Sequence, residues 1–203
     1  MRGKYLVAIA SFFGIIIFTS SCRTAKNYST HYYFQNERVL NAIEKSYSTI
    51  NKQTPFNIAF NNKAFSILTL EIKTDSLTYR YEFNATEPRL TDTLNKYHLN
   101  AAKVTQLIQY MQSIRCIWIN SLDYYVDDKK KSLVFISIRT TASNSLFGYK
   151  KYYILSYFSQ PQYFDQEGRL LVRRKRNVIH KINGDIFRRI NDKICYTISE
   201  QYR

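Results

Sequence analysis

The chain has 203 residues, a formal net charge of +15 and 45% hydrophobic residues, which favours a folded, basic protein. Only three glycines, Gly148, Gly168 and Gly184, lie beyond the first 21 residues. Because glycine-rich phosphate loops need several glycines close together, the composition excludes Rossmann and P-loop nucleotide sites.

The first 22 residues have the layout of an export signal. Arg2 and Lys4 supply positive charge, residues 5–18 are almost entirely apolar, and the segment ends in Thr19-Ser20-Ser21-Cys22. A basic head, an apolar middle and small residues before the cleavage point are typical of secretory signals. A spanning helix needs ~20 apolar residues, and this run is shorter.

This segment resembles the signal peptide and lipobox of bacterial lipoproteins, although Thr19 stands where leucine is usual. The resemblance implies cleavage before Cys22 and acylation of its thiol and new amino terminus, with palmitate among the expected chains. Several acyl chains on one residue make release from a membrane negligible, since each buried CH₂ contributes ~0.8 kcal/mol. Arg23 in place of aspartate implies sorting to the outer membrane, facing the periplasm. The alternatives are an ordinary cleaved signal and an uncleaved anchor.

Cleavage would lower the formal charge from +15 to +13 and leave about 180 residues, enough for a single domain with its own core. Residues 22–30 are polar and unpatterned, which predicts a lipidated tether before one domain over 31–203. Eight extended residues span at most ~28 Å, so that domain would stay near the bilayer.

Apolar spacing predicts a first helix over 32–52 and a short strand over 56–60. Strict alternation over 65–84 predicts a β-hairpin with one buried face. Residues 85–98, around Pro88, are expected to be a loop. Asn100 is a suitable N-cap for a second helix, whose apolar stripe is Val104, Leu107, Ile108, Met111 and Ile114.

Three further strands are expected at 116–126, 132–140 and 149–158, with turns at 127–131 and 163–168. Additional strands are expected at 169–174 and 177–182. Ile186, Ile190, Ile194 and Ile198 predict a last helix that starts at 183–185. Together with the abundance of tyrosine and phenylalanine, this order predicts an α+β fold, a mainly antiparallel sheet with about three helices on one face.

The cysteines form an even pair if Cys22 is acylated. Cys116 and Cys195 could then form a disulfide in an oxidising envelope. The alternative is two buried thiols, because free cysteine packs well as a small apolar side chain.

No cofactor, metal site or catalytic residue is predicted. His31, His98 and His180 lack the paired spacing of zinc ligands, and only a composite of His180 with the two later cysteines remains. The acidic pairs Asp127-Asp128 and Asp165/Glu167 fall in predicted turns, where carboxylates are usually solvated turn formers.

A basic run, Arg173, Arg174, Lys175 and Arg176, is the strongest charge feature. One interpretation is a solvated strand end. The other is contact with an anionic lipid or cell-wall polymer, where each basic residue near an anionic membrane contributes ~1 kcal/mol. Nucleic acid is excluded as a partner by the envelope location.

Three hypotheses about function follow. The first is a non-catalytic binding or interaction domain, lipid-anchored in the cell envelope. The second is a periplasmic lipid- or saccharide-binding protein with a cavity between sheet and helices. The third is a hydrolase in which His98 or His180 lies beside a carboxylate.

Overall fold

The computed structural model describes residues 2–126, 129–142, 150–171 and 187–199, and in the first helix it describes side chains from Lys26 onward. These residues form three helices and an eight-stranded antiparallel sheet, which confirms the predicted α+β class. The helices are α1 (Arg2–Asn51), α2 (Pro88–Lys96) and α3 (Ala101–Ser113). The strands are β1 (Phe56–Phe60), β2 (Ile67–Lys73), β3 (Thr78–Asn84), β4 (Trp118–Val126), β5 (Lys129–Ala142), β6 (Lys150–Phe158), β7 (Arg188–Arg189) and β8 (Ile194–Ser199).

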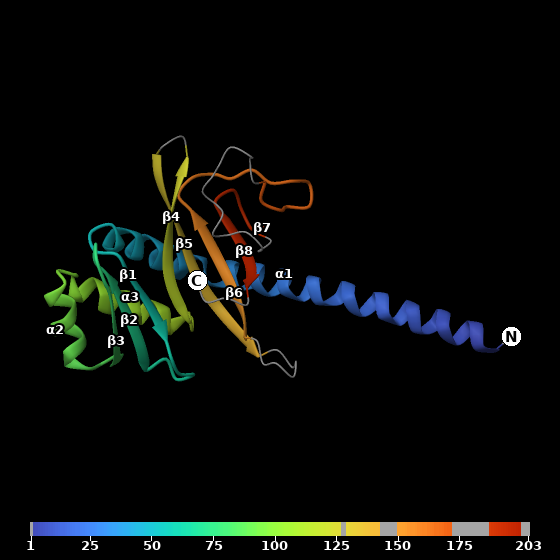
Figure 1. The fold of residues 1–203 in the computed structure, drawn as a ribbon, viewed down its shortest axis with the longest axis horizontal. Helices are drawn as coiled ribbons and strands as arrows, with labels where there is room; N and C mark the ends of the chain where they lie inside the picture. Colours follow the sequence, from blue (N-terminus) through green and yellow to red (C-terminus); the bar gives the residue numbers. More distant parts are fainter. Residues whose placement is uncertain (1, 127–128, 143–149, 172–186, 200–203) are drawn as a thin grey trace.

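The strand order is β3-β2-β1-β4-β5-β6-β8-β7. Helix α1 runs across one face of this sheet, and its N-terminal part extends beyond the sheet (Figure 1). The main core fills the layer between helices and sheet, because alternate residues of each strand point into it. Its fully buried members include Leu40, Tyr47, Ile58, Leu70 and Leu107.

The opposite face of the sheet is divided into two parts. Over β4, β5, β6 and β8 it carries a second buried cluster that includes Trp118, Phe135, Phe158 and Phe187. Over β1, β2 and β3 it is polar. This division leaves one half of the outer face open, and the candidate site extends onto it.

Helix α1 begins earlier than the predicted residue 32. The segment 22–30, expected as an unpatterned tether, is helical, and Ser29 is fully buried. The buried positions Ser29, Tyr33, Leu40, Ile43, Tyr47 and Ile50 share one helix face. The tyrosines extend the apolar stripe toward the N-terminus, so packing against the sheet starts with Tyr28.

Helix α2 corrects the loop predicted over 85–98. Pro88 occupies the first turn, where the missing N–H of proline costs nothing. Leu90 and Leu94, one turn apart, are buried against the core. The predicted cap of α3 is confirmed, since Asn100 Oδ1 accepts a hydrogen bond from the Lys103 amide at 3.0 Å.

The last predicted helix is wrong: β7 and β8 occupy its described part. Residues four positions apart lie on the same face of a helix. They also lie on the same face of a strand, because every second residue of a strand points to the same side. Ile194 and Tyr196 face the main core, whereas Cys195 faces the second cluster. The β-branched and aromatic residues of Ile194–Ser199 favour the strand.

The remaining strands agree with the predicted alternation. The hairpin of β2 and β3 pairs Leu70 with Tyr81 and Ile72 with Tyr79. Strand β5 begins at Lys129, so part of the predicted turn at 127–131 is strand, while Asp127 and Asp128 lie outside the described residues. Gly168 has the expected positive φ of 74°. Most of the strands predicted at 169–174 and 177–182 also falls outside the described residues.

Candidate functional site

A cleft of about 1090 Å³ opens at one end of the sheet and continues onto its polar outer face. It lies beside the paired ends of β1 and β4, where Ala59 pairs with Trp118 and the Phe60 amide donates to the Ile117 carbonyl at 2.8 Å. Its volume lies just above the ~300–1,000 Å³ usual for ligand pockets. The lining residues are Tyr28, Tyr32, Ala59, Phe60, Asn61, Asn62, Lys63, Phe65, Thr69, Glu71, Arg80, Ile114, Arg115, Ile117, Trp118, Ile138, Thr140 and Tyr152.

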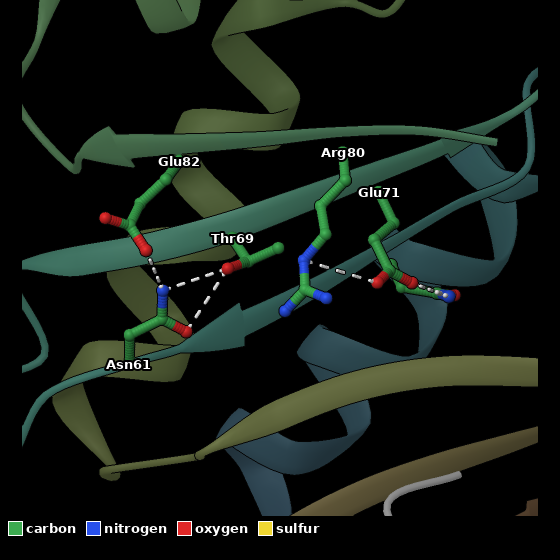
Figure 2. A network of polar contacts seen from close by, with 6 residues as sticks. Asn61, Thr69, Glu71, Arg80 and Glu82 are labelled. Atoms are coloured by element: carbon green, nitrogen blue, oxygen red, sulfur yellow. Dashed lines mark hydrogen bonds and ion pairs between the residues drawn. The ribbon is translucent and has the colours of Figure 1, made fainter.

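The floor is a polar network on the outer face of β1, β2 and β3 (Figure 2). The Asn61 amide donates to Thr69 Oγ1 at 2.9 Å and to Glu82 Oε2 at 2.6 Å, and Thr69 donates back to Asn61 Oδ1 at 3.2 Å. These bonds join the residue that follows β1 to strands β2 and β3. The Asn61 side chain is therefore held in a fixed orientation beside the opening of the cleft.

Arg80 and Glu71 form the second part of this floor. The Arg80 guanidinium lies 3.8 Å from the Glu71 carboxylate, and Glu71 also accepts a hydrogen bond from the Asn57 amide at 3.3 Å. Because the Arg80 side chain is 71% exposed, this ion pair is screened by water and contributes little to stability. The guanidinium remains accessible to a ligand.

Two loops with left-handed backbones form one rim. Phe65 has φ 55° and Arg115 has φ 57°. Residues other than glycine adopt this left-handed backbone region infrequently. The Arg115 guanidinium lies over the Phe65 ring, 5.4 Å from its centre, and donates to the Lys63 carbonyl at 3.3 Å. The loop after β1 and the end of α3 are thus fixed together around the cleft.

Arg115 adopts its conformation because it ends α3. The Cys116 amide donates to the Met111 carbonyl at 2.8 Å and the Arg115 amide donates to Gln112 at 3.0 Å, the two bonds of a Schellman motif. Glycine is the usual residue at this position. His98, with φ 58°, ends α2 by the same pair of bonds and lies outside the cleft.

Helix α1 contributes two tyrosines. Tyr28 packs edge-on against Tyr153 at 5.4 Å, and the Tyr32 hydroxyl donates to the Ile114 carbonyl. Burial, with Cys116 and Tyr28 nearby, raises the pKa of Tyr32 above its ordinary value. This hydroxyl therefore remains a neutral donor at physiological pH.

The other side of the cleft is made by β4, β5 and β6. Trp118 is fully buried and packs edge-on against the half-buried Tyr152, with ring centres 6.2 Å apart. Trp118 is the single tryptophan of the chain. Its indole therefore reports on this side of the cleft.

Among the predicted site residues, Cys116 and Cys195 have described side chains, and neither lines the cleft. Cys22 lies in α1, among the residues whose side chains are not described. Arg173, Arg174, Lys175 and Arg176, as well as His180, lie outside the described residues.

The structure contains no Cys116–Cys195 disulfide: both residues are buried free thiols. Cys116 belongs to the main core and Cys195 to the second cluster, so they lie on opposite faces of the sheet. Cys116 immediately precedes β4 and Cys195 lies in β8, and strands β5 and β6 lie between these two strands in the sheet. Adjacent strands lie ~4.8 Å apart, which places the cysteines beyond the reach of a disulfide.

The structure records no hydrogen bond or ion pair of the exposed His98 side chain with a carboxylate. Among the described residues, no group of three histidine, cysteine or acidic side chains is arranged to hold a metal ion. In the same part of the chain, no helix combines the length and the apolar character required to cross a bilayer.

Comparisons with family models, curated proteins and solved structures found no match to this chain. The sequence predicted a β-hairpin over 65–84, which includes Arg80, and no element over Asn61, Asn62 and Lys63. It did not bring these residues together with Arg115, which follows α3. The sequence showed the polar face of the hairpin beside the asparagine-rich segment 61–63. It did not indicate which other residues of the chain would lie next to them.

Proposed function

We propose that this chain is a lipid-anchored protein of the bacterial cell envelope and a non-catalytic binding domain, with its cleft held close to the membrane surface. The anchor is Cys22, acylated after removal of residues 1–21, and the location is the periplasmic side of the outer membrane. The signal-like segment and the residue that follows Cys22 support this proposal.

One observation carries the binding role. Tyr28 and Tyr32, which line the cleft, follow Cys22 on the same helix. At the helical rise, Cys22 and Tyr28 are separated by about 9 Å along the axis. A ligand at the membrane surface would be within reach of such a cleft.

The acid of the cleft also favours binding over catalysis. Glu71 is engaged by Arg80 and Asn57, an arrangement that fixes the strand face rather than one that transfers protons. A general acid or base must instead reach the reacting group of a substrate with a suitable pKa.

Expression in a lipoprotein-processing bacterium tests the anchor. We expect the intact mass of the mature protein to correspond to residues 22–203 plus acyl chains, and the protein to partition with membranes. Cys22→Ala should stop processing and acylation, whereas Cys195→Ala, which changes a different thiol, should leave both intact. A Cys22→Ala protein that is processed and sediments with membranes like the parent would contradict the proposal.

A further inference from the structure

We propose that the cleft binds a linear, carboxylate-bearing polysaccharide of the kind that makes up the bacterial cell wall. This inference rests on the proposed envelope location, but it concerns the chemistry of the cleft. It identifies the ligand from three properties of the lining: aromatic rings, fixed amide and hydroxyl groups, and an excess of positive charge.

Aromatic rings lie on opposite sides of the cleft. Tyr28 and Tyr32 come from α1, Phe65 from the rim loop and Tyr152 from β6, and all four are half-buried. A half-buried ring presents an apolar surface, and the C–H faces of sugar rings pack on such surfaces. Tyrosine adds a polar hydroxyl to the same side chain, which suits a ligand that is both apolar and hydroxylated.

Polar groups between these rings are oriented in advance. The Asn61 amide is fixed by Thr69 and Glu82, and Thr140 adds a hydroxyl on the β5 side. A few oriented polar groups among apolar ones are the usual arrangement of a specific small-molecule site. Both amide hydrogens are engaged by Thr69 and Glu82, so Asn61 Oδ1, already held in place, can accept from a sugar hydroxyl with little additional ordering.

The charge of the lining selects an anionic ligand. Three side chains, Lys63, Arg80 and Arg115, are cationic, and two are acidic, Glu71 in the lining and Glu82 in the floor network. Arginine binds carboxylates through two parallel hydrogen bonds. The Arg115 guanidinium, stacked over Phe65, is held in position at the rim, where it can meet a carboxylate carried on a sugar.

The packing of the molecule favours a polysaccharide over a lipid. The layer between helices and sheet is filled by side chains such as Leu40, Ile58 and Leu107, each fully buried. An acyl chain entering from the cleft would have to displace this core. An open cleft at the end of a sheet instead accommodates a polymer that enters and leaves at its sides.

Titration calorimetry on the mature acylated protein in phosphatidylcholine nanodiscs tests this inference. The probe is peptide-free cell-wall glycan of alternating N-acetylglucosamine and N-acetylmuramic acid. The control is a chitooligosaccharide of equal length, which has similar rings without the carboxylate. Glycerol phosphate, the headgroup of phosphatidylglycerol, tests the lipid alternative.

We expect the wall glycan to bind at least tenfold more tightly than the chitooligosaccharide and to change the fluorescence of the single tryptophan, Trp118, which lines the cleft. Arg115→Gly should weaken glycan binding about tenfold or more, because it removes a charge-assisted hydrogen bond. Since glycine suits this backbone position, the variant should still fold. His98→Gly makes the same backbone change outside the cleft and should bind like the parent.

Three results would overturn the inference: equal affinity for both oligosaccharides, no binding of the wall glycan, or preferential binding of glycerol phosphate. Unchanged affinity in Arg115→Gly would remove the assigned carboxylate contact and equally count against it. Failure of the anchor is distinguishable, because a non-acylated protein would not enter the nanodiscs and its binding would be measured in free solution.

Discussion

Cys116 and Cys195 lie in environments that differ strongly from that of an exposed, reactive thiol. Both are buried, and burial raises the pKa of each thiol, to about 12 for Cys195. Because the thiolate is the reactive form, these thiols are inert in the folded protein. Burial on opposite faces of the sheet thus accounts for both the absence of a bond between them and their low reactivity.

We expect iodoacetamide to leave Cys116 and Cys195 unmodified in the native protein and to modify both in concentrated urea. Intact-mass measurement before and after unfolding counts the added groups. Modification of either residue at the rate of an exposed thiol would contradict the burial. So would a native mass lower by two hydrogens, because that is the signature of a disulfide.

Stability should fall at alkaline pH because of Cys195. Its ordinary pKa of 9.0 rises to about 12 in the folded protein. Above pH 9 the unfolded chain loses this proton first, so the contribution is complete below pH 9 and is lost as pH rises toward 12. The loss is at most ~1.4 kcal/mol per pH unit for one group. Urea unfolding from pH 7 to 10.5 should show a shallower decline in Cys195→Ala than in the parent, and an identical decline would refute this origin.

At the scale of elements, the cap of α3 is a separate source of stability. Asn100 Oδ1 satisfies the Lys103 amide, one of the unpaired donors at the start of the helix. Asn100→Ala should lower the free energy of unfolding by ~1 kcal/mol, measured by urea denaturation. Gln109→Ala, at an exposed position of the same helix, should leave it nearly unchanged. Equal stability of the two variants would show that the cap contributes nothing.

The sequence predicted correctly those elements whose apolar pattern fits only the helical period or only the strand period. In β2, Leu68, Leu70 and Ile72 alternate with exposed or polar positions, a pattern that no helix reproduces. In α3, Val104, Leu107, Ile108 and Met111 follow a spacing that no strand reproduces. Local periodicity was sufficient in both elements.

The incorrect predictions have equally local causes. The spacing of Ile190, Ile194 and Ile198 satisfies both periods, and only pairing of β8 with β6 decides between them. Pro88 was interpreted as a loop marker, although proline at a first helical turn is favourable. Helix α1 extends past its predicted start because Tyr28 and Tyr32 pack against groups distant in sequence.

The cleft could not be predicted from the sequence for a related reason. Phe65 and Arg115 are fifty residues apart, and their contact depends on how the end of α3 meets the loop after β1. The alternation of the hairpin placed Glu71 and Arg80 on its polar face, but it did not show that β1 would add Asn61 to that face. Long-range strand order, rather than local pattern, creates the site.

At the scale of the whole molecule, charge and the proposed anchor would act together. The proposed mature chain carries a formal charge of +13, and three of the cleft residues contribute cations. Attraction to an anionic surface decays within a Debye length of ~8 Å at physiological salt. An anchor that holds the domain at this distance would allow weak attraction to orient it. The basic run at 173–176 is the strongest local concentration of charge in the sequence that could supply this attraction.

We predict that Arg173, Arg174, Lys175 and Arg176 strengthen association with anionic membranes. The test compares residues 22–203 carrying Cys22→Ser, produced without acylation, with the same chain in which these four residues are glutamine. Sedimentation with phosphatidylglycerol vesicles should weaken by up to ~1 kcal/mol per charge, and the difference should shrink at high salt.

The matched control removes the same amount of charge from scattered exposed positions. It changes to glutamine the residues Arg38, Lys52, Lys73 and Lys103. A basic run that acts as one contact surface must lose more affinity than this control, because its four charges approach the bilayer together. If both variants lose the same affinity, net charge alone determines the attraction, and the run is the solvated segment of the alternative interpretation.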